Sequence, residues 1–420
     1  MARRRPPVAQ LDYQHGRSPR KSPEERRCAH FGGRRPPVSE SDPAPNELTV
    51  RLAPSVGQFE ADAWNALGGH RNPFVSHEFL TAMEDSGSVG EGTGWDPVPV
   101  VITDAHDNLL AAMPSYAKGH SQGEYVFDHS WADALQRAGR NYYPKLQIAA
   151  PFTPASGPRL LFSDESLAPH LLKGAEAVCL QNGLSSAHAT FVEADQVPLF
   201  EAGDWLIRDD IQFHWINRDY TSFDGFLDAL ASRKRKNLRK ERAAAQDGLK
   251  IVHLSGDDIK PEHWDAFWVF YQDTGARKWG TPYLTREAFT LLGERMGERI
   301  VLILAYDDEL PIAGALNFVG AEALYGRYWG CTQDVRFLHF ELCYYQAIDI
   351  AIELGLPRVE AGAQGGHKLA RGYEPVPTHS AHWLADPGFR EAVADFLVRE
   401  RDGVATDKLF LGERTPFKKS

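Results

Sequence analysis

The sequence has few cysteines, no long apolar run and no cluster of metal-binding side chains. Its four cysteines, Cys28, Cys179, Cys331 and Cys343, stand far apart, and no pair has metal-ligand spacing. We therefore expect free thiols in a reducing cytoplasm. No stretch of about 18 consecutive apolar residues occurs, so no membrane-spanning helix is expected.

Other familiar motifs are missing as well. Sixteen histidines are present, but none forms a His-Glu-x-x-His or His-x-x-x-His pattern, so no metal site is predicted. A Gly-x-Ser-x-Gly elbow, a Walker loop and a Rossmann fingerprint in its proper context are absent. The net charge of −11 argues against nucleic-acid binding by the whole surface.

The first 45 residues differ in composition from the rest of the chain. They hold ten Lys or Arg against five Asp or Glu, with eight prolines and almost no apolar periodicity. Such a segment buries too little apolar surface to offset its chain entropy, so residues 1–45 are predicted to be a disordered basic tail. They lack the continuous apolar core of a secretory signal. An Arg-rich arm of this kind could contact RNA or anionic lipid, or serve no purpose in the working protein.

The remainder reads as two copies of one unit, because 420 residues exceed one ordinary core and the element order repeats. Each half is predicted as strand, helix, helix, hairpin, strand, helix, strand. Residues 72–78 (NPFVSHE) align with 281–287 (TPYLTRE), where Ser76 and Thr285 act as helix N-caps with an acid in the first turn. The predicted units are 46–218 and 219–405, followed by a C-terminal tail at 406–420.

The stretch from Tyr325 to Trp383 organises the second half. It predicts a strand ending near Thr332, a mostly apolar helix over 337–354, and a short strand over 358–361. A strand, a crossover helix and a second strand build a parallel or splayed pair. Glu341, near the helix start, is either a buried catalytic carboxylate or a first-turn acid favoured by the helix dipole.

Two polar segments have alternative interpretations. Polar and aromatic residues crowd between two strands of the first half and indicate either a binding wall for sugar or peptide or a structural insertion; they are Asp128, His129, Trp131, Tyr142, Tyr143 and Lys145. Between Arg233 and Arg242, seven positive charges and one negative lie on every face of a predicted helix, Phe223 to Ala245. This is a solvated helix end, or a cationic arm that meets phosphate on a substrate or on tRNA.

The doubled unit resembles the acyl-CoA N-acyltransferase (GNAT) architecture used twice in a chain. The segments FDHSWADAL, NYYPKLQIAAPFTPASGPRLL, LYGRYWG, HFELCYYQAIDIAIELG and EAGAQGGHKLARGYEPVPTHSAHW are similar to the bacterial Fem-like family of predicted N-acyltransferases, linked by name to peptidoglycan biosynthesis or recognition. The resemblance covers about residues 47–405. Similarity to the Fem-type aminoacyl-tRNA-dependent peptidyltransferases is weaker, and rests on the basic helix and on the segment from Lys368 to Tyr373.

The resemblance implies transfer of an acyl group from acyl-CoA, or of an aminoacyl group from tRNA, to an amine. GNAT enzymes typically hold the cofactor pyrophosphate at the start of the crossover helix. In the second half this loop, residues 330–336, lacks the usual Gly-x-Gly/Ala pattern. In the first half Ser156, Gly157 and Arg159 suit a phosphate, but Pro154 and Pro158 lack N–H donors, and a structural turn is the alternative.

The segment after the crossover strand carries the candidate active site. Glu360 is expected at the strand end, where the sheet opens into a cleft, with His367, Lys368 and Arg371 beyond it. Glu360 or His367 would accept the amine proton, and Lys368 and Arg371 would hold an anionic substrate or leaving group. A salt-bridged turn is the alternative. Further substrate-binding candidates are Arg327, Tyr328, Trp329, Gln364 and Tyr373.

The sequence therefore predicts a mixed α/β protein of two tandem GNAT-like domains, each a twisted mixed sheet flanked by helices. The predicted function is a cytoplasmic, metal-free N-acyltransferase acting on a cell-wall precursor or an amino-acid-like small molecule. One alternative is a non-catalytic module that recognises a peptidoglycan precursor or another glycan. Another is an RNA-binding protein that uses residues 1–45 and 233–242 and shows steep salt dependence.

Overall fold

The computed structural model describes residues 48–278, 282–362 and 365–418. The disorder predicted for residues 1–45 lies outside these ranges. The described residues belong to one compact unit. Among them, no helix is both long enough and apolar enough to cross a membrane.

The first half of the chain forms short strands and three main helices. Its elements are β1 (Thr49–Leu52), α1 (Ala61–Trp64), the π-helical turn η2 (Asn65–Gly69), α2 (His77–Asp85), β2 (Trp95–Pro97), β3 (Val100–Thr103), β4 (Leu109–Met113), β5 (Ser115–Lys118), α3 (His129–Arg137), β6 (Lys145–Ile148), β7 (Leu161–Phe162), α4 (Ala168–Asn182), β8 (Ser186–Val192), α5 (Val197–Ala202) and β9 (Leu206–Ile216).

The second half has longer strands and a long final helix. Its elements are α6 (Phe223–Ala229), α7 (Ser232–Gln246), β10 (Leu249–Leu254), α8 (Pro261–Lys278), α9 (Arg286–Met296), β11 (Ile300–Asp307), β12 (Leu310–Val319), β13 (Ala323–Cys331), α10 (Leu338–Phe340), the π-helical turn η7 (Glu341–Tyr345), α11 (Gln346–Glu353), β14 (Arg358–Glu360), the 3-10 helix η8 (Gly366–Arg371), β15 (Glu374–Leu384) and α12 (Pro387–Gly412).

Local chemistry explains several of these boundaries. The two predicted N-caps are confirmed: Ser76 Oγ accepts from the Phe79 N–H, and Thr285 Oγ1 accepts from the Ala288 N–H. Gly183 ends α4 in the left-handed conformation at φ 65°, which glycine adopts without a Cβ penalty. Equivalent caps at equivalent helices support the repeat.

The strand pairing confirms the mixed α/β class and the doubled unit. In the first half β6 and β8 run parallel and are joined by α4. In the second half β13 and β14 run parallel and are joined by α10, η7 and α11. Each pair follows an antiparallel hairpin, β3–β4 in one half and β11–β12 in the other. The predicted crossover is therefore present twice.

The two halves do not keep separate sheets. One sheet of eleven strands has the order β10-β11-β12-β13-β14-β9-β15-β8-β6-β5-β2, and a second sheet has the order β1-β3-β4-β7. Strand β9 of the first half pairs with β14, and β15 of the second half pairs with β8. Each half therefore contributes a strand that pairs with the other half. The predicted boundary between residues 218 and 219 separates two repeat units, and it remains a prediction.

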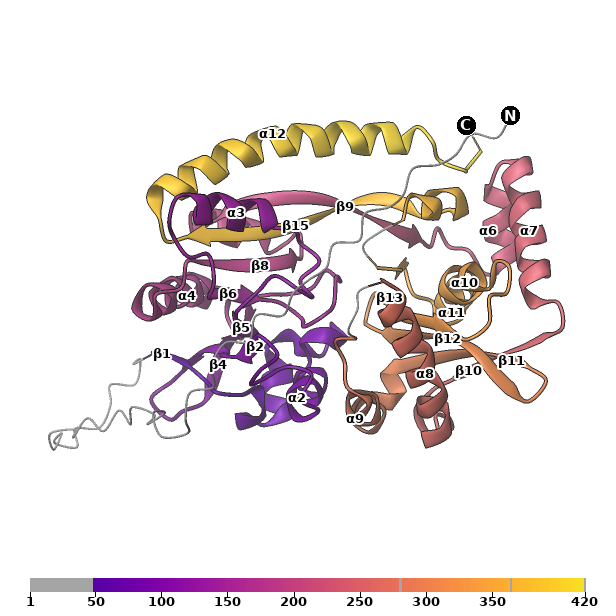
Figure 1. Ribbon diagram of the computed structural model, residues 1–420, viewed down its shortest axis with the longest axis horizontal. Helices are drawn as coiled ribbons and strands as arrows, with labels where there is room; N and C mark the ends of the chain where they lie inside the picture. Colours follow the sequence, from indigo (N-terminus) through magenta and orange to yellow (C-terminus); the bar gives the residue numbers. More distant parts are fainter. Residues whose placement is uncertain (1–47, 279–281, 363–364, 419–420) are drawn as a thin grey trace, which may run out of the picture. The chain divides into compact units, whose positions relative to one another are not determined.

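Helices cover the join between the halves. Helix α12 lies along β9 and β15 (Figure 1), and one hydrophobic core combines α1 and α2 with α8 and α9. Phe74 and Phe79 of the first half stack edge to face on Phe318 of β12 in this core. These contacts pack the first half of the chain directly against the second half.

Two predicted helices and the predicted C-terminal tail differ in detail. The predicted helix from Phe223 is two helices, because Leu230 is extended and forms a bridge with Phe417. The crossover helix contains the π-helical turn η7. The loose tail expected at 406–420 is corrected: α12 continues to Gly412, and the Ala231 N–H donates to the Pro416 carbonyl. Leu409 and Phe410 are exposed apolar residues, so the last turns of α12 lack a regular buried apolar face. An amphipathic pattern therefore did not predict this extension.

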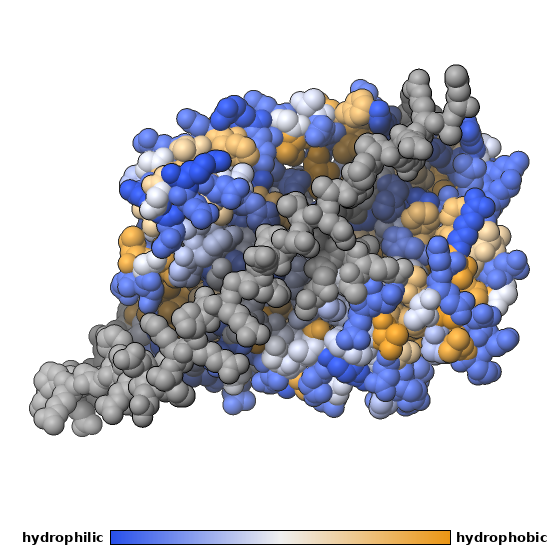
Figure 2. Space-filling view, in the orientation of Figure 1, coloured by the Kyte–Doolittle hydropathy of each residue, from blue (hydrophilic) through white to orange (hydrophobic). Residues whose placement is uncertain are grey.

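Hydrophilic residues dominate the face drawn in Figure 2, and hydrophobic residues are interspersed among them, including over α12. This distribution is usual for a protein in water, where single apolar residues reach the surface without forming an interface.

Replacing Gly330 by alanine is expected to destabilise the fold by about 1–3 kcal/mol, as overpacking does. A Cβ at Gly330 would lie 2.0 Å from the backbone oxygen of Phe270 in α8. Urea unfolding measures the effect. Gly403→Ala, on the exposed side of α12 with no atom within 4 Å, is the control and should be neutral or slightly stabilising. Equal stability of the two variants would contradict this packing of α8 on β13.

Candidate functional site

The main cavity of the described structure opens where β13 and β14 diverge. The two strands pair only from Ala323 to Tyr325 and from Arg358 to Glu360. Beyond these pairs, residues 326–329 on one strand and Ala361 and Gly362 after the other line a cavity of about 620 Å³. This is the cleft that the sequence predicted at the mouth of a splayed strand pair.

The opposite wall of the cavity comes from the first half. Residues 121–123, Tyr125, Phe127, His129 and Pro154 line it from that side. From the second half, α8 contributes Tyr271 and Thr274, and the crossover helix contributes the side chains His339, Cys343 and Tyr344. The cavity is thus built between the two halves and is rich in aromatic side chains.

The described cavity lining contains a guanidinium and imidazoles but no carboxylate. The lining includes Arg327, His129, His339 and His367, and among the described residues it includes no Asp or Glu. The Arg327 guanidinium donates to the Phe152 carbonyl and lies 5.0 Å from the Tyr328 ring centroid. No described carboxylate forms an ion pair with it. In a chain of net charge −11, this lining favours an anionic ligand.

Lys368 adds a second cation behind the wall. Its side chain is buried, and Nζ donates to the Gly362 carbonyl at 2.6 Å. Burial lowers the pKa of Lys368 to about 8, with Cys343 opposing and Arg327 adding to the shift. The ammonium therefore gives up its proton more readily than an exposed lysine does.

His367 lies on the cavity wall as predicted. Its Nε2 is 2.9 Å from the Tyr344 hydroxyl oxygen, and the ring also packs near Phe340. Burial raises the pKa of Tyr344, so this phenol stays protonated at neutral pH. The pair can move a proton between an imidazole and a hydroxyl group inside the cavity.

The other two predicted catalytic residues lie outside the cavity lining. Glu360 turns to the opposite face of β14, where Oε1 accepts from Arg358 Nε at 3.0 Å and Oε2 lies 3.8 Å from His214 Nε2. Adjacent strand residues point to opposite faces, which is why Ala361 reaches the cavity and Glu360 does not.

Glu341 is buried in the π-helical turn. Its Oε1 accepts from Arg242 Nε at 3.2 Å and from the amide nitrogens of Gln246 and Gln346 at 2.7 and 2.6 Å. Burial raises its pKa. It therefore ties α7 to the crossover helix. Glu341 is an acid in the first turn of its helical segment, as the second predicted alternative states, and it lies outside the described cavity lining.

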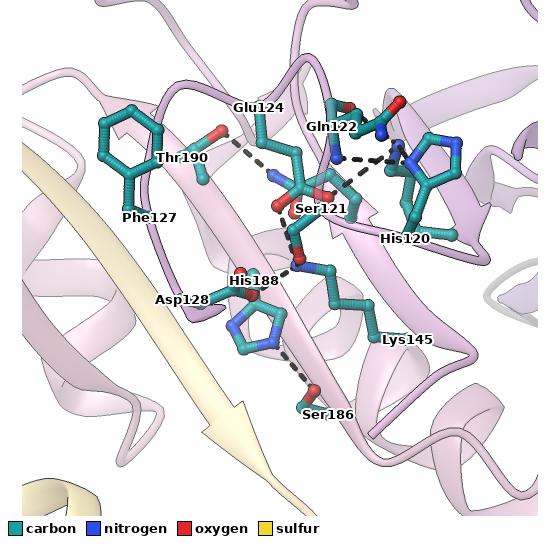
Figure 3. Close-up of polar contacts among 12 residues, drawn as sticks. His120, Ser121, Gln122, Glu124, Phe127, Asp128, Lys145, Ser186, His188 and Thr190 are labelled. Carbon is teal, nitrogen blue, oxygen red and sulfur yellow. Dashed lines mark hydrogen bonds and ion pairs between the residues drawn. The ribbon is translucent and has the colours of Figure 1, made fainter. Parts of the chain in front are cut away.

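The predicted first-half wall contains a buried ionic network beneath the cavity. Lys145 is fully buried, and its Nζ donates to Ser121 Oγ at 2.9 Å, to Glu124 Oε2 at 2.7 Å and to Asp128 Oδ2. Figure 3 shows these side chains converging on Lys145. The segment 121–129 is thereby fixed against β6, and it carries the first-half side of the cavity.

Burial shifts the titration of this network. It raises the pKa of Glu124 to about 7 and lowers that of Lys118 to about 7. Burial alone would also raise the pKa of Asp128, but the charge of Lys145 outweighs it and the pKa is lowered. His188, bonded to Ser186 in Figure 3, has its pKa lowered to about 3 by burial and by Lys145.

The rest of this wall divides between cavity and core. His129 lines the cavity, whereas Trp131 packs edge to face on His382 and Tyr142 donates to Asp128 Oδ2 at 2.6 Å. Tyr143 shares a hydrogen bond with Ser121 at 2.8 Å. Asp128, Lys145 and Trp131 are thus supporting residues with no direct access to the cavity.

The predicted first-half phosphate loop is closed. Arg159 is fully buried, and its guanidinium donates to the carbonyls of Thr190, Pro158 and Ala155. Gly157 forms an isolated parallel β-bridge with Val192, so this segment packs beside β8. The Gly157 N–H and the Arg159 guanidinium already donate to backbone carbonyls, so these two residues form no open anion site, whereas Ser156 is half-buried.

The last predicted residues have structural contacts. Arg371 donates to the His367 carbonyl and to Glu241 on α7, and its guanidinium lies 3.4 Å from the Phe340 ring centroid. Tyr373 is fully buried against Tyr344. Gln364 lies outside the described residues.

The basic helix α7 is partly neutralised. Arg235 pairs with Asp228, Arg239 with Asp224, and Arg242 with Asp349 and Glu341. Exposed cations without an ion pair to a described carboxylate remain on it; they are Arg233, Lys234, Lys236 and Lys240. These four retain the capacity to meet phosphate.

Sequence reasoning missed several cavity residues. Tyr271, Tyr283, His339 and Tyr344 lie on helices or loops whose facing depends on the other half. Asn317 carried a readable signal, since it is a polar residue inside the apolar run Ile312–Val319 of β12.

One protein-family model matches most of this chain. The model of the FemAB-like family, described as peptidoglycan biosynthesis/recognition, matches residues 55–419. No curated protein sequence matches the chain.

Several solved structures are similar in shape at low identity. L-PGS from Bacillus licheniformis is 9% identical, with 78% of this chain and 98% of that chain covered and a TM-score of 0.47. FemX is 11% identical, with 76% and 93% covered and a TM-score of 0.47. A tandem GNAT protein from the clavulanic acid biosynthesis pathway is 14% identical, with 81% and 99% covered and a TM-score of 0.43.

Proposed function

Because this chain belongs to the FemAB-like family, we propose that it is an N-acyltransferase that works in the cavity between its two halves. It transfers an acyl or aminoacyl group from CoA or tRNA to the amine of a cell-wall precursor or an amino-acid-like small molecule. The observation that carries the proposal is the cavity at the diverging ends of β13 and β14, with Arg327 in its lining and the His367–Tyr344 pair.

The proposed reaction is a direct transfer. The amine nitrogen attacks the acyl carbonyl carbon, and the bond from that carbon to the thioester sulfur or ester oxygen breaks. The leaving group takes the electron pair. His367 accepts the proton that the amine loses, and Tyr344, 2.9 Å away, can share it. Holding both substrates in one cavity supplies much of the rate enhancement.

The positive charges have a binding role. Arg327 and Lys368 attract the anionic part of a substrate to the point where the strands diverge. The exposed cations of α7 are proposed to contact phosphates of a tRNA donor, should tRNA be the donor used.

A transfer assay tests the function. Acetyl-CoA and alanyl-tRNA are offered as donors with a muropeptide acceptor, and the acylated amine is detected by mass spectrometry. Transfer from either donor supports the proposal. No transfer and no donor-induced thermal stabilisation, together with muropeptide binding, would contradict it.

That second outcome would favour a recognition module. One observation supports this alternative: Asp334 lines a smaller cavity of about 260 Å³ in front of the crossover helix, where a CoA pyrophosphate would otherwise be expected. A carboxylate repels phosphate, and the loop lacks the glycine pattern of a CoA site.

Donor binding is expected to weaken as pH rises through about 8. Lys368 has a pKa lowered to about 8, so it loses its charge above that pH, whereas an unburied lysine stays charged. The pKa of Lys368 is lower in the folded protein than in the unfolded chain. Between about pH 8 and 10.5 the unfolded chain therefore holds a proton that the folded protein has released, and the free energy of unfolding rises with pH. Isothermal titration between pH 7 and 9.5 measures the affinity.

Lys368→Arg is the matched control for this pH effect. Because arginine stays charged, its donor affinity should not change across the same range. An equal decline in both proteins would exclude Lys368 as the titrating group.

A further inference from the structure

Asn317 has a buried carbonyl oxygen beside the cavity. The residue is fully buried in β12 and belongs to the cavity lining. Its Nδ2 lies 3.4 Å from the Val301 carbonyl oxygen and 3.5 Å from that of Ala315, while Oδ1 has no partner among the described residues. The two carbonyls fix which way the amide is turned, because exchanging the atoms would place Oδ1 against two oxygens.

A β-bulge lies beside this buried oxygen. In the β12–β13 register Leu316 pairs with Tyr328 and Asn317 pairs with Gly326, so Arg327 is the extra residue. Gly326 has no side chain to cover Asn317, and a Cβ there would lie 3.3 Å from Oδ1. The bulge therefore places a guanidinium and a buried carbonyl oxygen without a described partner on neighbouring strands of one cavity.

We infer that Asn317 Oδ1 accepts a hydrogen from the acceptor amine. The inference rests on the proposed function and names the subsite for its second substrate, a primary amine. An unpartnered carbonyl oxygen can only accept, so it selects a group with N–H or O–H hydrogens over a thioester, an ester or a phosphate. Arg327 beside it attracts anions and so leaves the amine to Asn317.

The neutral carboxamide also suits the chemistry. An amine attacks only after losing its ammonium proton. A carboxylate at this position would hold the ammonium and oppose that loss. The amide oxygen binds the amine through one hydrogen and leaves its lone pair to approach the acyl carbon.

Kinetics test the subsite in the transfer assay. Asn317→Leu should raise KM for the amine about 10- to 100-fold, the value of a hydrogen bond to a charged group, and leave KM for the donor within about two-fold. Gly326→Ala keeps Asn317 and covers its oxygen with a methyl group, so it should act in the same direction without removing the amide. Unchanged amine KM in Gly326→Ala and Asn317→Leu would overturn the inference.

The matched control is Gln147→Leu. Gln147 is also a fully buried amide whose oxygen has no partner among the described residues, but it lies on β6 outside the cavity lining. Its loss should leave both KM values unchanged. An equal rise in amine KM from this variant would attribute the effect to general loosening and overturn the inference.

A binding measurement separates this inference from the proposed function. The full chain is titrated with n-butylammonium and, separately, with n-butyltrimethylammonium, which has the same charge and no N–H. The side-chain amide resonance of Asn317, identified by its loss in Asn317→Leu, should shift with the first ion only. That result supports the subsite even if no transfer is found. A shift with both ions, or with neither, overturns it whether or not the chain transfers acyl groups.

Discussion

Replacing Lys145 by methionine is expected to destabilise the protein by about 3–5 kcal/mol at pH 8, the cost of removing one partner from a buried charge pair. Lys145 is fully buried and donates to Glu124, Asp128 and Ser121. Without it two carboxylates remain buried with only Lys118 nearby, 3.8 Å from Glu124. Urea unfolding of the full chain measures the loss.

The loss should shrink as pH falls. In the variant the buried carboxylates have raised pKa values, so the folded protein binds protons that the unfolded chain does not, and stability falls as pH rises through that range. The matched control is Lys173→Met, because Lys173 pairs with Glu176 while 69% of its own side chain stays accessible to water. This surface pair should contribute less than about 1 kcal/mol. Equal losses in Lys145→Met and Lys173→Met would contradict the buried network.

Replacing Arg327 by glutamine is expected to lower kcat/KM for transfer roughly 100-fold, because it removes a charged hydrogen-bond donor from the cavity. Arg327 is the arginine of the described lining and has no described carboxylate partner. Its charge is thus available to a ligand. The transfer assay measures the change, with thermal unfolding recorded in parallel.

Arg299→Gln is the control for Arg327. Arg299 also donates to backbone carbonyls, those of His70 and Val319, but lies outside the cavity lining. Both variants lose similar backbone contacts, so both should lose similar stability. If the two variants also lost similar activity, the loss in Arg327→Gln would follow from lost stability, and the charge of Arg327 would not contribute specifically to binding.

The sequence predicted the local elements well because their signals are local. The hairpin turns, the N-caps Ser76 and Thr285, and the crossover between β13 and β14 follow from residues close together in the chain. The strand exchange did not follow, and β15 was not predicted as a strand. The hydrophobic pattern of a strand is the same whichever strand it pairs with. The sequences of β9 and β15 therefore do not indicate their partners.

The candidate site was predicted in part for the same reason. His367 and Arg327 both line the cavity, His367 from the segment after β14 and Arg327 from the bulge within β13. Glu360 does not, because facing alternates residue by residue and the strand end was predicted only to within a residue. Lys145 was among the residues predicted to form either a binding wall or a structural insertion, and its burial in an ionic network fits the structural alternative.

The central claim is that the donor's acyl end enters the cavity where β13 and β14 diverge. A crystal structure of the full chain with a non-hydrolysable acyl-CoA analogue, and one with an aminoacyl-tRNA end analogue, tests it most directly. We expect the acyl carbonyl of one analogue beside Arg327 and His367, between the two halves. An acyl group bound only in the first half beside β8, or only at Asp334, would contradict it.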